Sequence, residues 1–137
     1  MDQYSTSIVG LLALCLLSLL LAIYSGISKG RAKALAGPVA DARDDNPLYR
    51  IDRAHMNSVE ALAPFAVPAV LAMLVGVGPV LLAILVWLHL AIRLAHLVVY
   101  LRGGRPATGG NVRTVLYVSS GLVTIVLILV TAWTALT

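Results

Sequence analysis

The sequence predicts an all-α membrane protein, built as a single bundle of four transmembrane helices. Composition is the first reason: of 137 residues, 60% are apolar and only 12% are charged, against roughly half and a quarter in an average soluble domain. The second reason is that the apolar residues lie in blocks of about twenty, enough for a helix to cross a hydrocarbon core about 30 Å thick. A chain of this length should form one domain, which we expect to cover residues 1–137.

The first half of the chain predicts two spans joined by a polar linker. The first span, about residues 8–33, is apolar nearly all round and continues into a basic stretch, so this helix should project from the bilayer. The linker over residues 37–49 contains prolines and an Asp-Asp-Asn run that interrupt any helical pattern. The second span covers about residues 48–76, and Pro64 and Pro68 are expected to kink it.

The second half predicts two more spans. A tight, uncharged turn rich in glycine leads into the third span, over about residues 79–102. A loop of arginine and glycine, which holds Arg105, then leads to the fourth span, over about residues 111–136. Cys15 is the one cysteine and lies inside the first span, so no disulfide forms within the chain.

Apart from Arg93, the basic residues lie on one side of this predicted topology. They are Lys29, Arg31, Lys33, Arg43, Arg50 and Arg53 around the first loop, and Arg102, Arg105 and Arg113 around the second. By the positive-inside rule both loops should face the cytoplasm and both termini the other side of a bacterial inner membrane or of the endoplasmic reticulum. Lipid headgroups and topology therefore explain the net charge of +4, and nucleic-acid binding is not expected.

Polar residues that are costly inside a bilayer lie on one face of three predicted helices. They recur every three or four residues, which a helix with 3.6 residues per turn places on one stripe. The stripes are Arg53, Asn57 and Glu60 in the second span; His89, Arg93, His96 and Tyr100 in the third; and Arg113, Tyr117, Ser120 and Thr124 in the fourth. Counted from the uncharged ends at about 1.5 Å per residue, Glu60 lies roughly 24 Å deep, Arg93 about 21 Å and His96 about 26 Å. The three stripes should thus meet at one level, where Lys29 and Arg31 end the first span.

The charge of these stripes predicts an anionic ligand. Arginines outnumber Glu60, which we take as the single carboxylate at this level, so internal pairing cannot neutralise them. Less specific interpretations stay open, because flanking arginines can snorkel, the tyrosines can be interfacial aromatics, and Glu60 and Arg93 can form a structural ion pair. His89 is expected to be structural, and since His89 and His96 lack a third ligand, no metal site is predicted.

Three motifs in order resemble the MAPEG family, the membrane-associated proteins of eicosanoid and glutathione metabolism. Residues 53–60, followed by Pro64 and Phe65, look like the helix-two signature of that family. Residues 93–100, Arg-Leu-Ala-His-Leu-Val-Val-Tyr, resemble its helix-three motif, and residues 113–117, Arg-Thr-Val-Leu-Tyr, its helix-four motif. The four-span layout matches as well, so the resemblance covers nearly the whole chain. The branch it most resembles is that of microsomal glutathione transferase and microsomal prostaglandin E synthase.

The resemblance implies a homotrimer that binds glutathione between neighbouring subunits, with membrane lipids around it. It also implies that Arg113 lies beside the glutathione thiol and that Lys29 or Arg31 reaches in from the first helix. The residues implied to line the glutathione site are Arg53, Asn57, Glu60, His96, Tyr100, Arg113 and Tyr117, and the polar stripes add Arg93. The predicted charge agrees, because glutathione has two carboxylates for the arginines and an ammonium for Glu60.

The expected function is glutathione transfer, by conjugation or as a peroxidase, onto lipophilic electrophiles that arrive through the bilayer between helices one and four of adjacent subunits. Arg113 is the expected catalytic cation, assisted by the hydroxyl of Thr114 or Tyr117. Prostaglandin E synthase has a serine and an arginine where this chain has Thr114 and Met56. These two differences favour general glutathione transfer and leave prostaglandin isomerisation as the alternative. A non-catalytic lipid-binding scaffold and a small trimeric conduit for ions or drugs are further alternatives.

Overall fold

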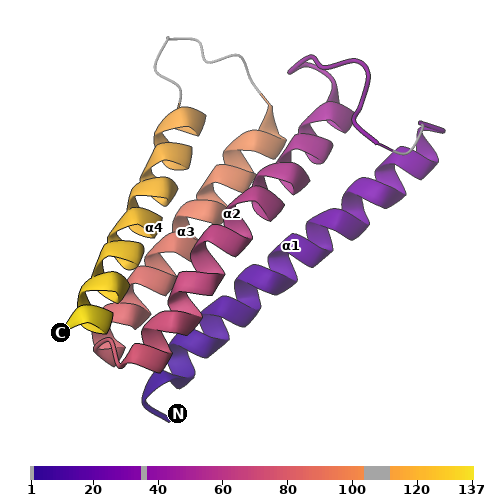
Figure 1. The fold of residues 1–137 in the computed structure, drawn as a ribbon. Helices are drawn as coiled ribbons and strands as arrows, with labels where there is room; N and C mark the ends of the chain where they lie inside the picture. The colour runs from indigo at the N-terminus through magenta and orange to yellow at the C-terminus, as the bar shows by residue number, and fades with distance from the viewer. Residues whose placement is uncertain (1, 35–36, 104–111) are drawn as a thin grey trace.

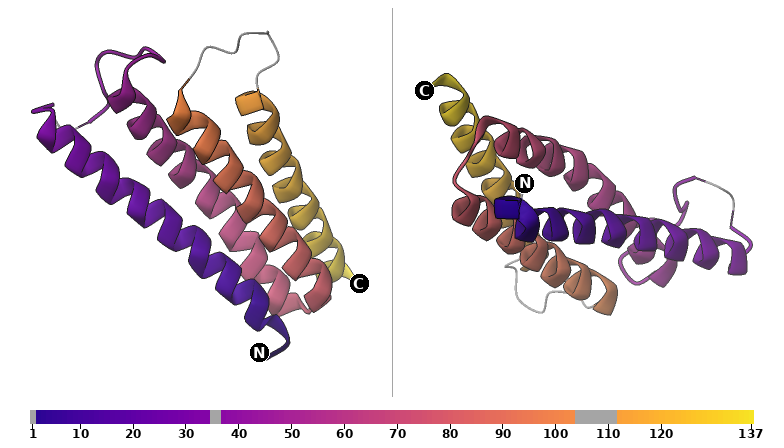
Figure 2. Two further views of the ribbon diagram at one scale, coloured as in Figure 1. Left: turned by 180° about the vertical axis from the view of Figure 1, so that it is seen from behind. Right: turned by 90° about the horizontal axis from the view of Figure 1, so that it is seen from below.

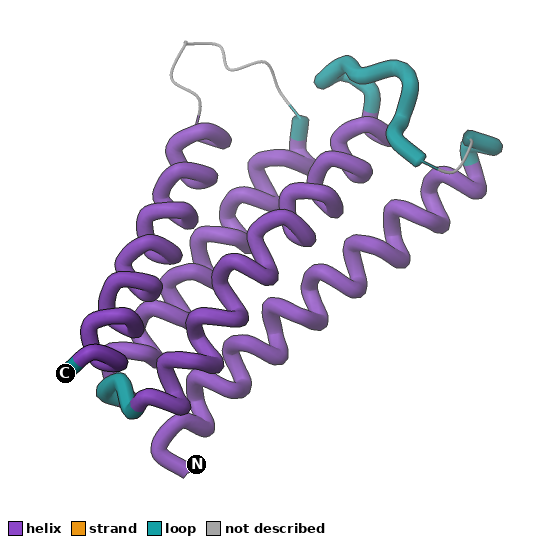
Figure 3. Tube along the Cα trace, in the orientation of Figure 1, coloured by secondary structure: helices purple, strands orange, loops and turns teal. Residues whose placement is uncertain are grey.

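The structure is a computed structural model that describes residues 2–34, 37–103 and 112–137. Within these ranges the chain forms four long α-helices (Figure 1, Figure 3). They are α1 (Ser5–Arg31), α2 (Pro47–Val75), α3 (Pro79–Arg102) and α4 (Val112–Leu136), with a short 3-10 helix, η1 (Asp2–Tyr4), before α1. The described ranges contain no strand, and the predicted all-α class is confirmed. Arg105 and the glycines that follow it lie outside the described residues.

Local sequence explains where α2 begins and ends. The Asn46 side chain accepts a hydrogen bond from the backbone N–H of Leu48 at 3.0 Å, and Pro47 occupies the first helical position, where no N–H is needed. Gly76 ends the helix with a φ of 86°, in the left-handed region that glycine adopts without steric cost. The turn is short, so α3 begins at Pro79 and runs back along α2.

The two central helices are α2 and α3, and α1 and α4 flank them. Both flanking helices pack against α2 and against α3. The N-terminus, the C-terminus and the α2–α3 turn lie at one end of the bundle, which we call the turn end (Figure 1). The opposite end carries the connector between α1 and α2, residues 37–46, and we call it the connector end. There α1 leans away from α3 and α4 (Figure 1, Figure 2).

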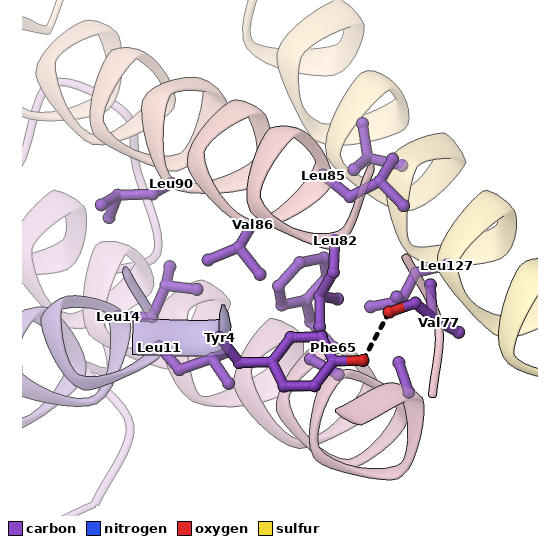
Figure 4. Packing of buried hydrophobic residues seen from close by; sticks show 13 residues of the cluster. Tyr4, Leu11, Leu14, Phe65, Val77, Leu82, Leu85, Val86, Leu90 and Leu127 are labelled. Carbon is purple, nitrogen blue, oxygen red and sulfur yellow. Dashed lines mark hydrogen bonds between the residues drawn. The ribbon is translucent and has the colours of Figure 1, made fainter. Parts of the chain in front are cut away.

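The apolar core lies toward the turn end. Phe65 of α2, Leu82 of α3 and Leu127 of α4 have no exposed surface, and Leu11 and its neighbours on α1 close the cluster (Figure 4). Close packing of this kind supplies dispersion contacts, which hold helices together where the surroundings are as apolar as the core.

Two contacts fix the start of the chain against this core. The hydroxyl of Tyr4 donates a hydrogen bond to the backbone oxygen of Val77 at 2.7 Å, across 73 residues of sequence (Figure 4). Gly10 allows α1 to approach α3 closely, because a Cβ there would lie 2.5 Å from Cγ1 of Val86. Neither contact follows from a periodic pattern, and the sequence did not predict them.

The outer surface of the bundle is apolar. Leu12, Leu74 and Leu129 expose 63%, 75% and 64% of their surface, an arrangement that a bilayer tolerates and water does not. Each of the four helices is long and apolar enough to cross a membrane, judged by length and composition. α2 continues as one helix through Pro64 and Pro68.

Candidate functional site

The predicted polar stripes meet in the connector half of the bundle. We call the residues that gather there the polar layer: Arg53 and Asn57 of α2, Arg93, His96 and Tyr100 of α3, and Arg113 and Tyr117 of α4. The stripes of α2 and α3 are in direct contact, because a guanidinium nitrogen of Arg93 donates a hydrogen bond to the backbone oxygen of Asn57. Arg93 is 6% exposed and Asn57 is 7% exposed. The contact therefore lies inside the bundle.

Arg53 and Glu60 lie differently, although both belong to the α2 stripe. Arg53 is half-buried, and its Nη2 donates to Oδ1 of Asn57 at 3.5 Å, which is a long hydrogen bond. Glu60 is exposed on the surface of α2. The ion pairs of the described residues do not include Glu60 with Arg93, so the structural pair that the sequence allowed does not form within one chain.

Arg113 lies where α3 and α4 approach the connector. Its guanidinium carbon stands 4.7 Å from the ring centroid of Tyr100, a cation–π distance. Its Nη1 lies 3.0 Å from Oδ2 of Asp44 in the connector, and the Arg113 side chain is only 18% exposed. The ring of His96 lies 5.6 Å from that of Tyr100 and 6.3 Å from that of Tyr117, between centroids. The ring of His96 thus lies near both tyrosine rings, and the shielded guanidinium of Arg113 covers one of them, Tyr100.

Other residues singled out in the sequence lie at the margins of this layer. Thr114 is exposed on α4 beside Arg113, and Tyr117 exposes 51% of its surface. Arg31, the last residue of α1, is exposed. His89 is 1% exposed and stacks on Phe65 with 3.8 Å between ring centroids, the packing expected of a structural histidine.

A second polar cluster, which the sequence did not predict, joins α1 to α2. The ammonium of Lys29 pairs with the carboxylate of Asp52. That carboxylate also accepts hydrogen bonds from Oγ of Ser25 at 3.2 Å and from the backbone N–H of Val39 at 3.3 Å. Asp52 is 5% exposed. The expectation that Glu60 is the single carboxylate at this level is therefore wrong, and Lys29 is paired within its own chain.

Sequence reasoning misses Asp52 because its neighbours, Arg50 and Arg53, make it resemble one more charge at a membrane surface. The burial of Asp52 depends on how the connector folds back over α2, which no local pattern encodes. One signal was available: Ser25 and Lys29 are spaced i, i+4 and share one face of α1. A hydroxyl and an ammonium on the same face of a membrane helix need a hydrogen-bond acceptor, and one carboxylate can serve both.

A cavity of about 520 Å³ opens between α1, α2 and the connector. It is lined by Lys29, Gly37, Pro38, Val39, Ala42, Tyr49, Asp52, Arg53, His55 and Met56. A second hollow of about 420 Å³ shares Lys29 and His55 with it. Nδ1 of His55 is buried and has no hydrogen-bond partner in the part of the chain that the structure describes. Arg53 lines the cavity and also reaches Asn57, so the cavity and the polar layer share a wall.

The chemistry of the site is that of cations and aromatic rings. Arg53, Arg93 and Arg113 contribute three guanidinium groups, which bind carboxylates and stabilise anions. Nη1 of Arg93 is buried without a hydrogen-bond partner among the described residues, so this donor is unsatisfied within one chain. Across residues 2–34, 37–103 and 112–137 no three His, Cys, Asp or Glu side chains converge as metal ligands do.

Comparison with known proteins identifies the family of this chain. The sequence profile of the MAPEG family matches residues 7–133, a range that includes the whole polar layer and the cluster around Asp52. No curated protein and no solved structure matches the chain significantly. The four apolar helices agree with the family architecture, which is a four-helix membrane bundle. The chain is an integral multi-pass membrane protein and belongs to the MAPEG family, whose members act in glutathione and eicosanoid metabolism.

Proposed function

We propose that this chain is a glutathione-dependent membrane transferase that acts on lipophilic electrophiles, by conjugation or as a peroxidase. The observation that carries the proposal is the position of Arg113. Its guanidinium is shielded from solvent and stands over the ring of Tyr100, in the part of the layer that also contains His96. A thiol is a poor nucleophile until it ionises, and a cation at close range favours the thiolate.

The charges of the layer support glutathione as the thiol. Arg53 and Arg93 supply one guanidinium for each of its two carboxylates, and Nη1 of Arg93 has no partner among the described residues. Glu60 supplies the matching anion for the glutathione ammonium, from the exposed side of α2. Asn57 and Tyr100 add groups that can form hydrogen bonds to the rest of glutathione. The residues present match the charged groups of glutathione in number and in sign.

The chemistry then follows from the residues around Arg113. Glutathione supplies the nucleophilic sulfur when it is bound. Arg113 stabilises the thiolate electrostatically, and the hydroxyl of Thr114 or Tyr117 donates a hydrogen bond to it. Asp44 occupies only Nη1 of Arg113, at 3.0 Å, and a guanidinium has four further N–H donors. In conjugation the thiol proton would leave to solvent, the sulfur would form the C–S bond with its lone pair, and the leaving group would depart with its bonding electrons, so the negative charge would move away from Arg113.

We further propose that the functional unit is a homotrimer with the site at subunit interfaces. Glu60 and Tyr117 are exposed on a single chain, and a charge at bilayer depth costs about 2.5 to 3.5 kcal/mol on insertion scales. A neighbouring subunit that covers Glu60 and supplies a polar or cationic partner offsets that cost. Arg31 is better suited than Lys29 to reach this site from the first helix of the neighbour, because Asp52 already holds Lys29.

The same proposal includes an orientation. The connector end carries the basic residues Lys29, Arg50, Arg102 and Arg113, so by the positive-inside rule it faces the cytoplasm, and both termini lie on the other side. The membrane is then a bacterial inner membrane or the endoplasmic reticulum. Glutathione reaches the layer from the cytoplasm, and the electrophile reaches it from the bilayer.

Binding and turnover by the purified protein in mild detergent test the proposal. We expect glutathione to bind in the micromolar to millimolar range, and a lipophilic aryl halide to be conjugated. A protein that binds glutathione yet conjugates nothing from a panel of aryl halides, epoxides, hydroperoxides and activated alkenes is a lipid-binding scaffold instead. Conversion of a prostaglandin endoperoxide without aryl halide conjugation favours the isomerase. Native mass spectrometry that finds only monomers contradicts the interfacial site.

A further inference from the structure

The connector, residues 37–46, is fastened to the bundle at three places, and the first depends on the buried carboxylate of Asp52. The ammonium of Lys29 donates to the backbone oxygen of Gly37 at 2.6 Å while it pairs with Asp52. Asp52 accepts the backbone N–H of Val39 at 3.3 Å. The side chains of Lys29 and Asp52 are only 17% and 7% exposed. One ion pair therefore holds two successive parts of the connector against α1 and α2.

The second fastening is Arg50 of α2. Its Nη1 donates to the backbone oxygen of Asp44 at 2.7 Å. The same guanidinium packs against the end of α3, because a Cβ at Gly103 would lie 2.7 Å from Cζ of Arg50. Arg50 therefore fixes the backbone at Asp44 relative to both central helices.

The third contact carries the connector to the candidate site. Oδ2 of Asp44 lies 3.0 Å from Nη1 of Arg113, and the two residues are 69 positions apart in sequence. The contacts thus run from the buried pair through the connector to Arg113. Lys29 and Asp52 touch the connector, and the connector touches the cation on which the proposed chemistry depends.

We propose that Asp52 and Lys29 are positioning residues for Arg113: they anchor the connector, whose Asp44 holds the Arg113 guanidinium over Tyr100. A buried ion pair is weak evidence for stability, because desolvation offsets much of the attraction. Fixing the geometry of a neighbouring segment is a role that a directional, hydrogen-bonded pair performs better than an apolar contact. The effect on catalysis rests on the function proposed above, whereas the anchoring of the connector does not.

The first test is Asp52→Asn in the full-length protein, compared with Asp45→Asn. Both replace a connector-end carboxylate with an amide, but Asp45 is exposed, and its ion-pair partner among the described residues is the exposed Arg43. We expect hydrogen exchange of the amides of residues 37–46 to be about tenfold faster in Asp52→Asn, since a charged hydrogen bond is lost. Asp45→Asn should exchange like the wild type. Unchanged exchange in Asp52→Asn overturns the anchoring.

The second measurement separates positioning from general destabilisation. We expect kcat for aryl halide conjugation to fall between about tenfold and a hundredfold in Asp52→Asn, because a displaced guanidinium misses the thiolate. The glutathione KM should change by less than about threefold, since Arg53, Arg93 and Glu60 are untouched. A variant with loosened connector amides but wild-type kcat overturns the positioning role. If the wild type neither binds glutathione nor turns over, the proposed function fails, and exchange alone decides the anchoring.

A double variant keeps the test valid if Asp52→Asn does not fold. Lys29→Met together with Asp52→Leu removes both charges and leaves no unpaired ion in the bundle, an exchange that is often neutral or stabilising. We expect a folded protein of wild-type thermal midpoint whose connector amides exchange about tenfold faster. A stable double variant with a protected connector shows that the pair is not the anchor.

Discussion

The turn half and the connector half of the bundle are packed in different ways. In the turn half Phe65, Leu82 and Leu127 lose all exposed surface within one chain, and Oγ of Ser7 is a buried polar atom there that has no partner in the described residues. In the connector half α1 leans away, a cavity of about 520 Å³ opens, and buried nitrogens of His55 and Arg93 have no partner in the described residues. The apolar core of the turn half is complete in a single chain. We propose that a ligand and neighbouring subunits complete the connector half, so we expect substitutions in the two halves to change different properties.

The largest effect is expected at Arg113. Arg113→Leu should lower kcat/KM for aryl halide conjugation about a hundredfold to a thousandfold, the range for loss of a preorganised electrostatic group. The ultraviolet absorbance of bound thiolate should then appear only at higher pH, while the thermal midpoint stays near that of the wild type. Arg43→Leu is the matched control, because Arg43 is exposed in the connector and pairs only with exposed carboxylates. Full activity of Arg113→Leu would remove the role assigned to this residue.

The next effect concerns Glu60, which has no ion-pair partner in the described chain. Glu60→Gln should weaken glutathione binding by about 1 to 3 kcal/mol, because a charged hydrogen bond to the ammonium is lost. Titration calorimetry measures the change, with Asp45→Asn as the control for loss of a remote carboxylate. Equal affinities for wild type and Glu60→Gln would mean that glutathione lies in another orientation.

A matched pair of glycines on α1 compares the two halves directly through stability. A Cβ at Gly10 meets Cγ1 of Val86 at 2.5 Å, whereas a Cβ at Gly26 meets nothing within 4 Å. Gly10→Ala should destabilise the bundle by about 1 to 3 kcal/mol through overpacking, and Gly26→Ala should be neutral or stabilise it by up to about 1 kcal/mol. Unfolding midpoints in detergent decide this. Identical midpoints would show that the two halves of α1 are packed alike.

The smallest effect is expected at Thr114. Thr114→Val keeps the shape and removes one hydroxyl, so conjugation should fall about twofold to tenfold, the range for one neutral hydrogen bond. Thr124→Val is the control, since the Thr124 hydroxyl bonds the backbone oxygen of Ser120 in its own helix. A loss as large as that of Arg113→Leu would make Thr114 the main group at the thiol.

Local periodicity explains which of these features the sequence could predict. Each helix and each polar stripe depends on residues three or four apart, and the stripes of α2 and α3 do meet at Asn57 and Arg93. The contact between Tyr4 and Val77 spans 73 residues and that between Asp44 and Arg113 spans 69. Such pairs depend on how helices dock and loops fold back. A pattern read along one helix therefore finds the cations of the site but not the carboxylates that position them.

Both chain termini lie at the turn end, away from the polar layer (Figure 1). Arg113 and Leu136 stand near opposite ends of α4, which at about 1.5 Å per residue places them about 35 Å apart. An affinity tag or a fluorescent protein fused to either terminus is thus remote from the candidate site. A surface that captures the protein by its C-terminus presents the connector to dissolved thiols and leaves the sides of the bundle in contact with detergent or lipid.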